Sequence, residues 1–545
     1  MKIALAQQNY LIGDFEGNRT KIIAGIREAK TMGADLVLFS ELCVCGYPPR
    51  DFLEFSDFIN QCKESVSLIA QEAQGIGVLV GAPSVNSSPE GKDLYNSAHF
   101  LYDGKVQYII NKSLLPNYDV FDEYRYFEPN QSFGVYDFMG RRIGLTVCED
   151  IWNEGINPLY ITTPVEKLKE FGPDYLLNIS ASPFDHNKAV NRIELLSGLA
   201  KEYHLPIFYC NCVGAQTELI FDGGSLVIAP DGKVFDEMNY FSEQVKVYDL
   251  DEVITNKKKS FEQPKKRINL MQDALLTGIR DYFSKMNFQK AILGLSGGID
   301  SAVVACLATD ALGKKNVKAL LMPSEYSSTS SITDARQLAE TLGIDYSIIT
   351  IKEVYESCLG VLNPLFQNQP FDVTEENIQA RIRAIFLMAM CNKHHYILLN
   401  TSNKSEMAVG YGTLYGDMCG GISVLGDVYK TEVIELAHYI NEKEEIIPVN
   451  TITKPPSAEL RPDQRDSDSL PEYEVLDKIL FQYIEHRKGP LELIKMGFEK
   501  PLIDRILKLV NTNEHKRYQA APVLRVSQKA FGSGRRLPIV AKYLA

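Results

Sequence analysis

Residues 291–301 read Ala-Ile-Leu-Gly-Leu-Ser-Gly-Gly-Ile-Asp-Ser, and this stretch decides how the second half of the chain is interpreted. Its apolar beginning predicts a strand over 291–295, and the run Ala302–Ala311 predicts the helix that follows. The paired glycines let the backbone turn tightly and present N–H groups to a ligand, and the helix directs the positive end of its dipole toward the same place. The pattern predicts a phosphate-binding loop, although a plain strand-to-helix turn with a capping side chain would look alike.

The carboxylate inside this loop, Asp300, has a chemical consequence. Beside phosphates it would be repelled unless a cation lay between them, so we expect Mg²⁺ at Asp300. No lysine follows the glycines, and the loop therefore differs from the GxxxxGKS/T pattern of P-loop proteins. Ser-Gly-Gly-x-Asp-Ser after a strand resembles the pyrophosphate loop of the ATP pyrophosphatases, and that resemblance implies cleavage of ATP into AMP and pyrophosphate.

Strands and helices alternate beyond this loop. The apolar patterns predict strands at 317–322, 345–351 and 396–400 and helices at 330–342 and 376–392. Such alternation needs right-handed crossovers and predicts an α/β domain with a doubly wound, Rossmann-like parallel sheet. These sheets bind ligands at the carboxyl ends of their strands, where Thr401 and Glu406 would lie with the phosphate loop.

The first half shows a different mixture of elements. Apolar runs predict strands at 2–7, 36–39, 78–81, 143–148, 175–179, 207–210 and 225–228, and amphipathic stretches predict helices at 18–32 and 188–203. Asp103-Gly104 and Asp231-Gly232 are hairpin signals, so we expect mixed sheets. The pattern breaks at the basic segment KKKSFEQPKKR, 257–267. We therefore expect two large domains, 1–255 and 271–545, joined by a linker at 256–270.

The composition limits the classes of function. The 545 residues include 57 basic and 70 acidic side chains, and the net charge of −13 argues against a general nucleic-acid binder, because phosphate backbones attract basic surfaces. The opening MKIALAQQNY lacks the basic and apolar regions of a signal peptide, and no apolar window approaches the ~20 residues of a membrane span. The 10 cysteines form no CxxC pair and no zinc-like cluster, which predicts free thiols. We expect a cytoplasmic protein.

Further polar segments of the second half are Asn377-Ile-Gln-Ala-Arg381-Ile-Arg383, Thr401-Ser-Asn-Lys-Ser-Glu406, Gly416-Asp417, Lys430, Lys454-Pro-Pro-Ser-Ala458, Asp463-Gln464, Glu514-His-Lys516 and Phe531-Gly-Ser-Gly-Arg-Arg536. Together they resemble the NAD synthetase family, whose members use ATP to amidate nicotinic acid adenine dinucleotide (deamido-NAD). The resemblance implies an ATP site at Gly294, Leu295, Ser296, Gly297, Gly298, Ile299, Asp300, Ser301 and Thr401. It also implies Mg²⁺ at Asp300 and Glu406, and contacts to deamido-NAD from Asn377, Arg381, Glu406, Asp417, Lys430 and Lys516.

Three residues of the first half stand at the ends of predicted strands: Glu41, Lys112 and Cys148. Taken singly, such a cysteine is a buried thiol, and such a glutamate or lysine is a solvated side chain. Their surroundings, Ser40-Glu41-Leu, Asn111-Lys112-Ser-Leu-Leu-Pro116 and Thr146-Val-Cys148-Glu-Asp150, resemble the nitrilase superfamily. The resemblance implies an αββα sandwich and a catalytic role for all three residues.

The chemistry of the three side chains is coherent. A thiol is mostly protonated at neutral pH and needs a base, and Glu41 can accept the proton of Cys148 and pass it to departing ammonia. Attack on a carboxamide places negative charge on its oxygen, which the Lys112 ammonium and the backbone N–H after Cys148 can stabilise. Water activated by Glu41 then hydrolyses the thioester.

The resemblance implies that the amide is glutamine, because nitrilase relatives fused to NAD synthetases are glutaminases. By motif offset it implies glutamine contacts from Tyr118, Ser182 and Lys188, and an orienting role for Glu123. Position 188 is arginine in part of the family, which changes hydrogen-bond geometry more than charge. We therefore expect an ATP-dependent ligase of NAD biosynthesis that takes nitrogen from glutamine, binds these small molecules rather than nucleic acid or a membrane, and forms a homo-oligomer.

Three other functions fit the sequence less well. A GMP synthetase would carry its cysteine in a Gly-x-Cys-x-Gly elbow, which the segment around Cys148 lacks. A tRNA-thiolating pyrophosphatase would need paired sulfur-carrying cysteines and a basic surface. A nucleotide-sensing pseudoenzyme would have lost Cys148, Glu41 or Asp300, and all three are present.

Overall fold

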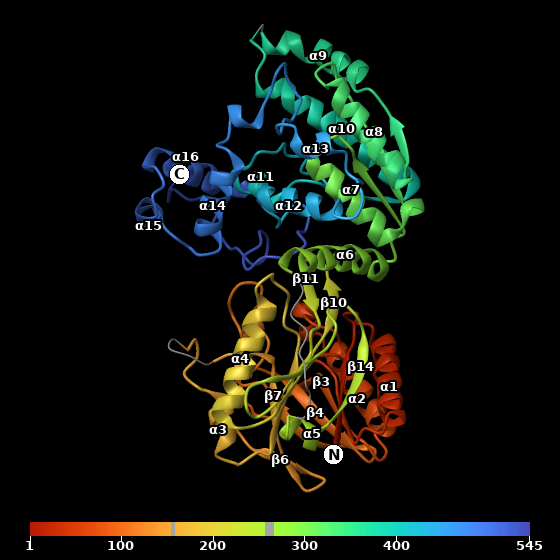
Figure 1. Ribbon diagram of the computed structural model, residues 1–545, viewed down its shortest axis with the longest axis vertical. Coiled ribbons are helices and arrows are strands. Elements are labelled where there is room, and N and C mark those ends of the chain that lie inside the picture. Colours follow the sequence, from red (N-terminus) through yellow and green to blue (C-terminus); the bar gives the residue numbers. More distant parts are fainter. Residues whose placement is uncertain (154–157, 257–265, 368, 545) are drawn as a thin grey trace. The chain divides into compact units, whose positions relative to one another are not determined.

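The computed structural model describes residues 1–153, 158–256, 266–367 and 369–544. The chain folds as two compact units, Met1–Leu270 and Met271–Ala545, and Figure 1 colours their elements along the sequence. The linker expected at 256–270 falls mostly on residues 257–265, which lie outside the described residues, and helix α6 (Arg267–Lys285) begins inside it. Among the described helices, none has the length and apolar character needed to cross a membrane.

The first unit is an αββα sandwich, which confirms the expected fold class. One six-stranded sheet has the order β14-β1-β2-β3-β4-β5 and the other β13-β12-β9-β8-β7-β6. Apolar side chains such as Leu5, Leu145 and Phe208 fill the space between the sheets. Helices α1 and α2 cover the first sheet, and α3 and α4 cover the second (Figure 1).

The strands of this unit are β1 (Lys2–Gln7), β2 (Leu36–Leu38), β3 (Gly77–Val85), β4 (Leu94–Tyr102), β5 (Lys105–Asn111), β6 (Val135–Phe138), β7 (Arg141–Val147), β8 (Tyr175–Ser180), β9 (Ile207–Asn211), β10 (Val213–Gln216), β11 (Leu219–Asp222), β12 (Leu226–Ile228), β13 (Val234–Glu237) and β14 (Gln244–Asp249). Its helices are α1 (Phe15–Thr31), α2 (Ser56–Glu72), α3 (Pro164–Lys169), α4 (Lys188–Tyr203) and α5 (Leu250–Ile254).

Burial on both faces explains why the central strands have continuous apolar sequences. Strand β8 is buried at every position and β1 at all but its first, since helices cover one side and the second sheet covers the other. Both hairpin predictions are confirmed: Asp103-Gly104 joins the antiparallel pair β4–β5, and Asp231-Gly232 joins β12–β13.

The second unit contains the predicted doubly wound sheet. Its five strands run parallel in the order β17-β16-β15-β18-β19. Helices α9 and α10 pack against Ile292, Leu320 and Leu398 on one face. Because the direction of the crossovers reverses at β15, right-handed connections place α7 and α8 on the other face. The apolar sides of α11, α14 and α16 form a separate core.

The strands of this unit are β15 (Lys290–Gly294), β16 (Val317–Leu321), β17 (Asp345–Ile348), β18 (Tyr396–Asn400) and β19 (Ile422–Ser423). Its helices after α6 are α7 (Ile299–Leu312), α8 (Thr329–Leu342), α9 (Lys352–Phe366), α10 (Val373–His394), α11 (Lys404–Val409), α12 (Lys430–Ile440), α13 (Val449–Thr453), α14 (Tyr473–Ile484), α15 (Pro490–Lys495), α16 (Lys500–Thr512) and α17 (Glu514–Arg517).

Helix α9 is an element of the second unit that the sequence patterns did not predict. Gly360 and Pro364 lie inside it, and both residues disfavour helices. Its apolar side chains nevertheless pack against α10 and the sheet, so tertiary burial outweighs local propensity. Strand β17 ends at Ile348, three residues before the predicted end, and Ile351 is already the N-cap of α9.

Candidate functional site

The first unit brings Glu41, Lys112 and Cys148 together at the ends of β2, β5 and β7. The Lys112 ammonium donates to Glu41 Oε1 at 2.7 Å and to both carboxylate oxygens of Glu123, at 2.9 and 2.8 Å. Glu41, Lys112 and Glu123 are buried, and Cys148 is 7% exposed. Sequence reasoning gave Glu123 an orienting role, and it lies in direct contact with the lysine.

Two local features hold the site's loops in position. Gly81 lets the Glu41 loop approach β3, because a Cβ at Gly81 would lie 2.3 Å from the amide nitrogen of Leu42. Asp150 joins the other two loops: its Oδ1 accepts from the amides of Ser113 and Leu114, just after Lys112, and its Oδ2 accepts from Val147 N. Cys148 itself begins a tight 3₁₀ turn with φ of 42°, in the left-handed region that residues other than glycine seldom adopt.

The electrostatics of the cluster favour a protonated thiol at rest. Burial raises the pKa of Cys148 well above its ordinary value, the charge of Glu41 raises it further, and Lys112 opposes the rise. Burial alone would lower the pKa of Lys112, but the charges of Glu123 and Glu41 raise it well above its ordinary value. Nucleophilic chemistry at Cys148 therefore needs a neighbouring base, and a permanent ammonium lies beside it.

The three residues expected to bind an amide substrate lie in two places near this cluster. Tyr118 donates its hydroxyl to Glu149 Oε1 at 2.8 Å, and Tyr160 donates to the same oxygen at 3.0 Å. Glu149 is buried, follows Cys148 directly and was not predicted from the sequence. A glutamate within a matched motif gives no sign of its own role, so only the structure identifies this carboxylate as part of the site.

Ser182 and Lys188 follow β8. The Ser182 amide donates to Asn211 Oδ1 at 2.9 Å, which holds the turn in place. The Lys188 ammonium lies 3.8 Å from the centroid of the Trp152 ring, and among the described residues no carboxylate lies within 4.0 Å of it. Burial lowers the pKa of Lys188, while the charges of Asp185, Glu149 and Cys148 oppose the shift. A cation without an ion-pair partner is suited to binding an anionic group.

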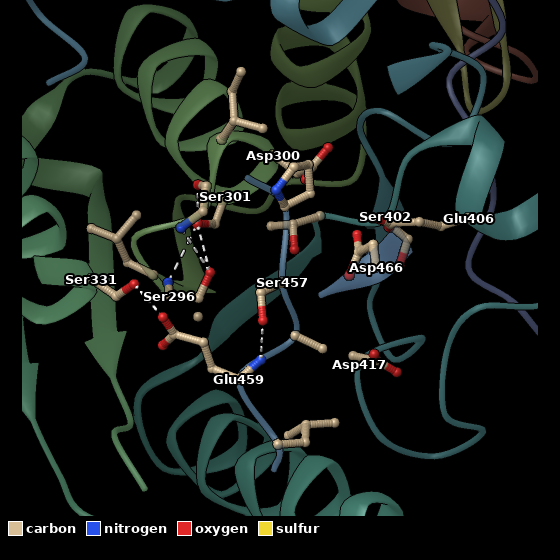
Figure 2. Close-up of a pocket in the computed structure, with 18 of the residues that line it drawn as sticks. Ser296, Asp300, Ser301, Ser331, Ser402, Glu406, Asp417, Ser457, Glu459 and Asp466 are labelled. Carbon is tan, nitrogen blue, oxygen red and sulfur yellow. Dashed lines mark hydrogen bonds between the residues drawn. The ribbon is translucent and has the colours of Figure 1, made fainter. Parts of the chain in front are cut away.

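The second unit holds a cavity of about 700 Å³ at the carboxyl ends of β15, β16 and β18 (Figure 2). All of the residues predicted for ATP except Gly297 line it: Gly294, Leu295, Ser296, Gly298, Ile299, Asp300, Ser301 and Thr401. Within the loop, Gly298 N donates to Ser296 Oγ and Ser301 Oγ donates to the Gly298 carbonyl. Gly297 has φ of 85°, and a Cβ there would lie 2.2 Å from the Ser331 carbonyl oxygen.

The predicted metal ligands lie together around Lys430. Its ammonium is 2.5 Å from Asp300 Oδ2 and 3.9 Å from Glu406 Oε1. Burial raises the pKa of Glu406 well above its ordinary value, and the charges of Asp300 and Asp466 add to the shift. Figure 2 shows Glu406, Asp417 and Asp466 on the side of the cavity opposite Ser296 and Ser331. This concentration of acidic oxygens favours a cation.

The donor atoms suit Mg²⁺, which prefers carboxylate oxygens. Among the described residues, no three histidine, cysteine, aspartate or glutamate side chains form a ready metal site. The protein would therefore supply few ligands, Asp300 and Glu406, and Mg²⁺ commonly completes such a shell with water and substrate phosphates.

The residues expected to contact deamido-NAD divide into two groups. Glu406, Asp417 and Lys430 line the cavity. Asn377, Arg381 and Lys516 do not, and they hold the glycine-rich segment 410–417. Asn377 Oδ1 accepts from Thr413 Oγ1, Arg381 Nε donates to the Leu414 carbonyl, and Lys516 Nζ donates to the Gly410 and Gly412 carbonyls, both at 2.8 Å.

Two further residues of the cavity were not predicted. Glu459 accepts from Ser331 Oγ at 2.7 Å and from Ser328 Oγ at 2.8 Å, close to the phosphate loop. Arg383 donates its Nε to the Met322 carbonyl, and among the described residues it has no ion pair within 4.0 Å. Burial lowers the pKa of Arg383 to about 10. Its place two residues after Arg381 in a matched motif was a signal that sequence reasoning passed over.

Two family models match the chain. The carbon-nitrogen hydrolase model matches residues 2–259, and the NAD synthase model matches residues 271–520.

Similar proteins match the chain along its whole length. The chain is 44% identical to the glutamine-dependent NAD(+) synthetase of Synechocystis sp., covering 99% of both chains. It is 41% identical to the glutamine-dependent NAD(+) synthetase of Thermotoga maritima, covering 100% of this chain and 99% of that protein. A solved structure of the glutamine-dependent NAD+ synthetase from Acinetobacter baumannii with adenosine diphosphate has a TM-score of 0.79, 38% identity, and coverage of 99% and 98%.

Proposed function

The chain belongs to the family of glutamine-dependent NAD(+) synthetases, and we propose that it joins two chemistries, release of ammonia from glutamine at Cys148 and ATP-dependent amidation of deamido-NAD in the cavity of the second unit. It is an ATP-dependent ligase of NAD biosynthesis. The observation that carries the proposal is the Lys112–Glu41 ion pair at 2.7 Å beside Cys148, in a chain that also holds a phosphate loop.

In the first reaction, Cys148 Sγ attacks the carboxamide carbon of glutamine while Glu41 accepts the thiol proton. The negative charge on the carbonyl oxygen is stabilised by the Lys112 ammonium and the Glu149 amide. Glu41 returns the proton as the carbon–nitrogen bond breaks and ammonia leaves. Water, deprotonated by Glu41, then cleaves the thioester to give glutamate and the free thiol.

Glutamine is bound through its charged end. The ammonium of Lys188, which has no ion-pair partner among the described residues, suits the α-carboxylate. The buried carboxylate of Glu149, which accepts from Tyr118 and Tyr160, suits the α-ammonium. Ser182 lies on the turn that Asn211 fixes and contributes a further polar contact.

In the second reaction, an oxygen of the nicotinate carboxylate attacks the α-phosphorus of ATP and pyrophosphate leaves. Ammonia then attacks the acyl carbon, AMP leaves, and the amide of NAD(+) is formed. The phosphate-loop residues Gly294–Ser301 and Thr401 bind ATP, and Arg383 provides a further cation near them. Mg²⁺ bound at Asp300 and Glu406 would neutralise charge on the phosphates.

The contacts to deamido-NAD come from Asn377, Arg381, Glu406, Asp417, Lys430 and Lys516. This part of the proposal is supported by two groups of side chains. Glu406, Asp417 and Lys430 line the cavity, and the others hold the adjoining segment 410–417. That segment would therefore adjust when the dinucleotide binds.

The proposal extends to organisation and location. We assign 1–255 to the glutaminase domain and 271–545 to the synthetase domain, supported by the extents of the two family models. A homo-oligomer is supported by exposed apolar side chains on α9 and α10, among them Val361, Leu365 and Ile385 at 71, 73 and 62% exposure. A cytoplasmic location is supported by the use of ATP and by ten free cysteines.

The decisive experiment compares nitrogen donors. The protein is incubated with deamido-NAD, ATP and Mg²⁺ and with either glutamine or ammonia, and NAD(+) is measured for the wild type and for Cys148→Ala. We expect the variant to lose synthesis from glutamine and keep synthesis from ammonia. Equal loss with both donors would contradict the assignment of two sites, and absence of NAD(+) from either donor in the wild type would contradict the function.

A further inference from the structure

Asn96 connects the two carboxylates of the glutaminase site, and neither the sequence patterns nor the proposed mechanism uses it. It lies on β4 and is fully buried. Its Nδ2 donates to Glu41 Oε1 at 2.7 Å and lies 3.4 Å from Glu123 Oε2. Its backbone carbonyl accepts from the amide of Lys112 at 2.8 Å. One side chain thus contacts both acids, and the same residue fixes the backbone that carries the catalytic lysine.

The orientation of the Asn96 amide is set by these acids. Its Oδ1 is buried and has no hydrogen-bond partner among the described residues, which costs free energy. If the amide group were flipped, Oδ1 would face the two carboxylates, which cannot donate to it when ionised, and the N–H groups would point to the place where Oδ1 now has no partner. An apolar side chain of the same size would avoid the unpaired oxygen. The side chain is therefore explained by the two N–H groups that it offers to Glu41 and Glu123, and folding alone does not explain it.

The charges around Glu41 give these N–H groups a function. Glu41 faces the ammonium of Lys112, the carboxyl of Glu123, the thiol of Cys148 and the hydroxyl of Tyr47. One ammonium serves two buried carboxylates, so the cluster lacks positive charge when both are ionised. A neutral donor stabilises an ionised carboxylate without adding a charge that would compete with Lys112 for the substrate oxygen.

We propose that Asn96 is a positioning residue for glutamine hydrolysis, which donates to the Glu41 carboxylate and holds it oriented toward Cys148. The inference rests on the proposed role of Glu41 as the base. Because the donor acts on the base, its loss affects proton transfer more than binding of glutamine. The acidic limb of the pH profile reports how readily the carboxylates of the site lose their charge, and a purely structural role of Asn96 would leave that limb in place.

The test measures glutamate release from glutamine by the full-length protein between pH 5 and 9. For Asn96→Ala we expect kcat/KM to fall about 10- to 100-fold at neutral pH, because a hydrogen bond to a charged group is lost, and the acidic limb to move up by about one pH unit. The loss should appear in kcat rather than KM. Asn96→Asp keeps the shape but adds a third carboxylate, so the limb should move at least as far.

Ser97→Ala is the matched control. Ser97 is the next residue on β4 and is also fully buried, but its hydroxyl bonds Asn111 and Ser84 and not the acids. We expect its acidic limb to match the wild type. The inference would be overturned if the acidic limb of the pH profile stayed in place in both Asn96 variants, or if it moved as far in Ser97→Ala. If Asn96→Ala does not fold, the pH profile of Asn96→Asp serves as the test.

A second pair of variants separates this inference from the proposed function. If Glu41→Gln and Cys148→Ala still hydrolyse glutamine, the proposed function itself fails. If both are inactive while the Asn96 variants keep the wild-type profile, only the role of Asn96 fails.

Discussion

Replacing Lys404 by methionine tests how the second unit holds the helix that carries Glu406. Lys404 is the first residue of α11 and has no exposed surface. Its ammonium donates to Glu485 Oε1 at 2.6 Å, Ser527 Oγ at 2.8 Å and the Lys529 carbonyl at 2.9 Å, and lies 2.8 Å from Asp427 Oδ1. The cluster therefore ties α11 to α14 and to the C-terminal segment.

The magnitude follows from what each partner loses. Asp427 keeps three donors, Val526 N, Ser527 N and Ser527 Oγ. Glu485 loses the donor to its Oε1, and its Oε2 has no partner among the described residues. Leaving a buried carboxylate unpaired in this way lowers the free energy of unfolding by ~3–5 kcal/mol.

The dependence on pH has a definite sign. Burial alone would lower the pKa of Lys404, but Asp427 and its neighbours raise it above the ordinary value of 10.5. The stabilisation from the charged lysine is therefore complete below the unfolded pKa and is lost only as the pH rises through the folded value. Between pH 6 and 9 the loss in Lys404→Met should stay constant.

Urea unfolding followed by circular dichroism measures the effect, while fluorescence of the single tryptophan, Trp152, follows the first unit separately. Lys404→Met with Glu485→Leu should recover at least ~1 kcal/mol of the loss, because no carboxylate is then left unpaired. Lys500→Met, which removes an exposed pair with Asp504, should cost less than ~1 kcal/mol. The reasoning is refuted if Lys404→Met costs no more than Lys500→Met, or if the double variant is no more stable than the single one.

Two further predictions concern the first unit. Burial raises the pKa of Glu123 from 4.5 to about 7, and the charge of Lys112 opposes this rise. Between these two pH values the folded protein keeps a proton on Glu123 that the unfolded chain has lost, so the free energy of unfolding falls as the pH rises through this range. Glu123→Gln should flatten this fall in urea midpoints measured at pH 5 and 7, and an unchanged slope would contradict the shift. Lys188→Met should raise KM for glutamine about 10- to 100-fold with a smaller change in kcat, because a contact to a charged group is lost. Because Lys188 lies over the Trp152 ring, we expect glutamine to change Trp152 fluorescence in the wild type and to leave it unchanged in Lys188→Met. A response retained in the variant would argue against contact between Lys188 and the substrate.

Local patterns were sufficient wherever structure depends on neighbours in the chain. The bounds predicted for β1, α4 and β18 agree with the structure, because apolar periodicity records which face of an element is buried. The phosphate loop was equally predictable, since its glycines and the start of α7 are contiguous. Glu41, Lys112 and Cys148 were found through matched motifs at strand ends, and the structure places all three in one cluster.

Only the tertiary structure decided which distant side chains meet. Lys430 contacts Asp300 across 130 positions, and Asn96 contacts Glu41 across 55. No local pattern encodes such pairs, because the loops that converge are set by strand order and sheet packing. Burial then excludes water around them, so that charges such as Glu123 and Lys112 act strongly on one another. The sequence determined the chemistry that the side chains can perform, and the fold determined which of them act on the same atoms.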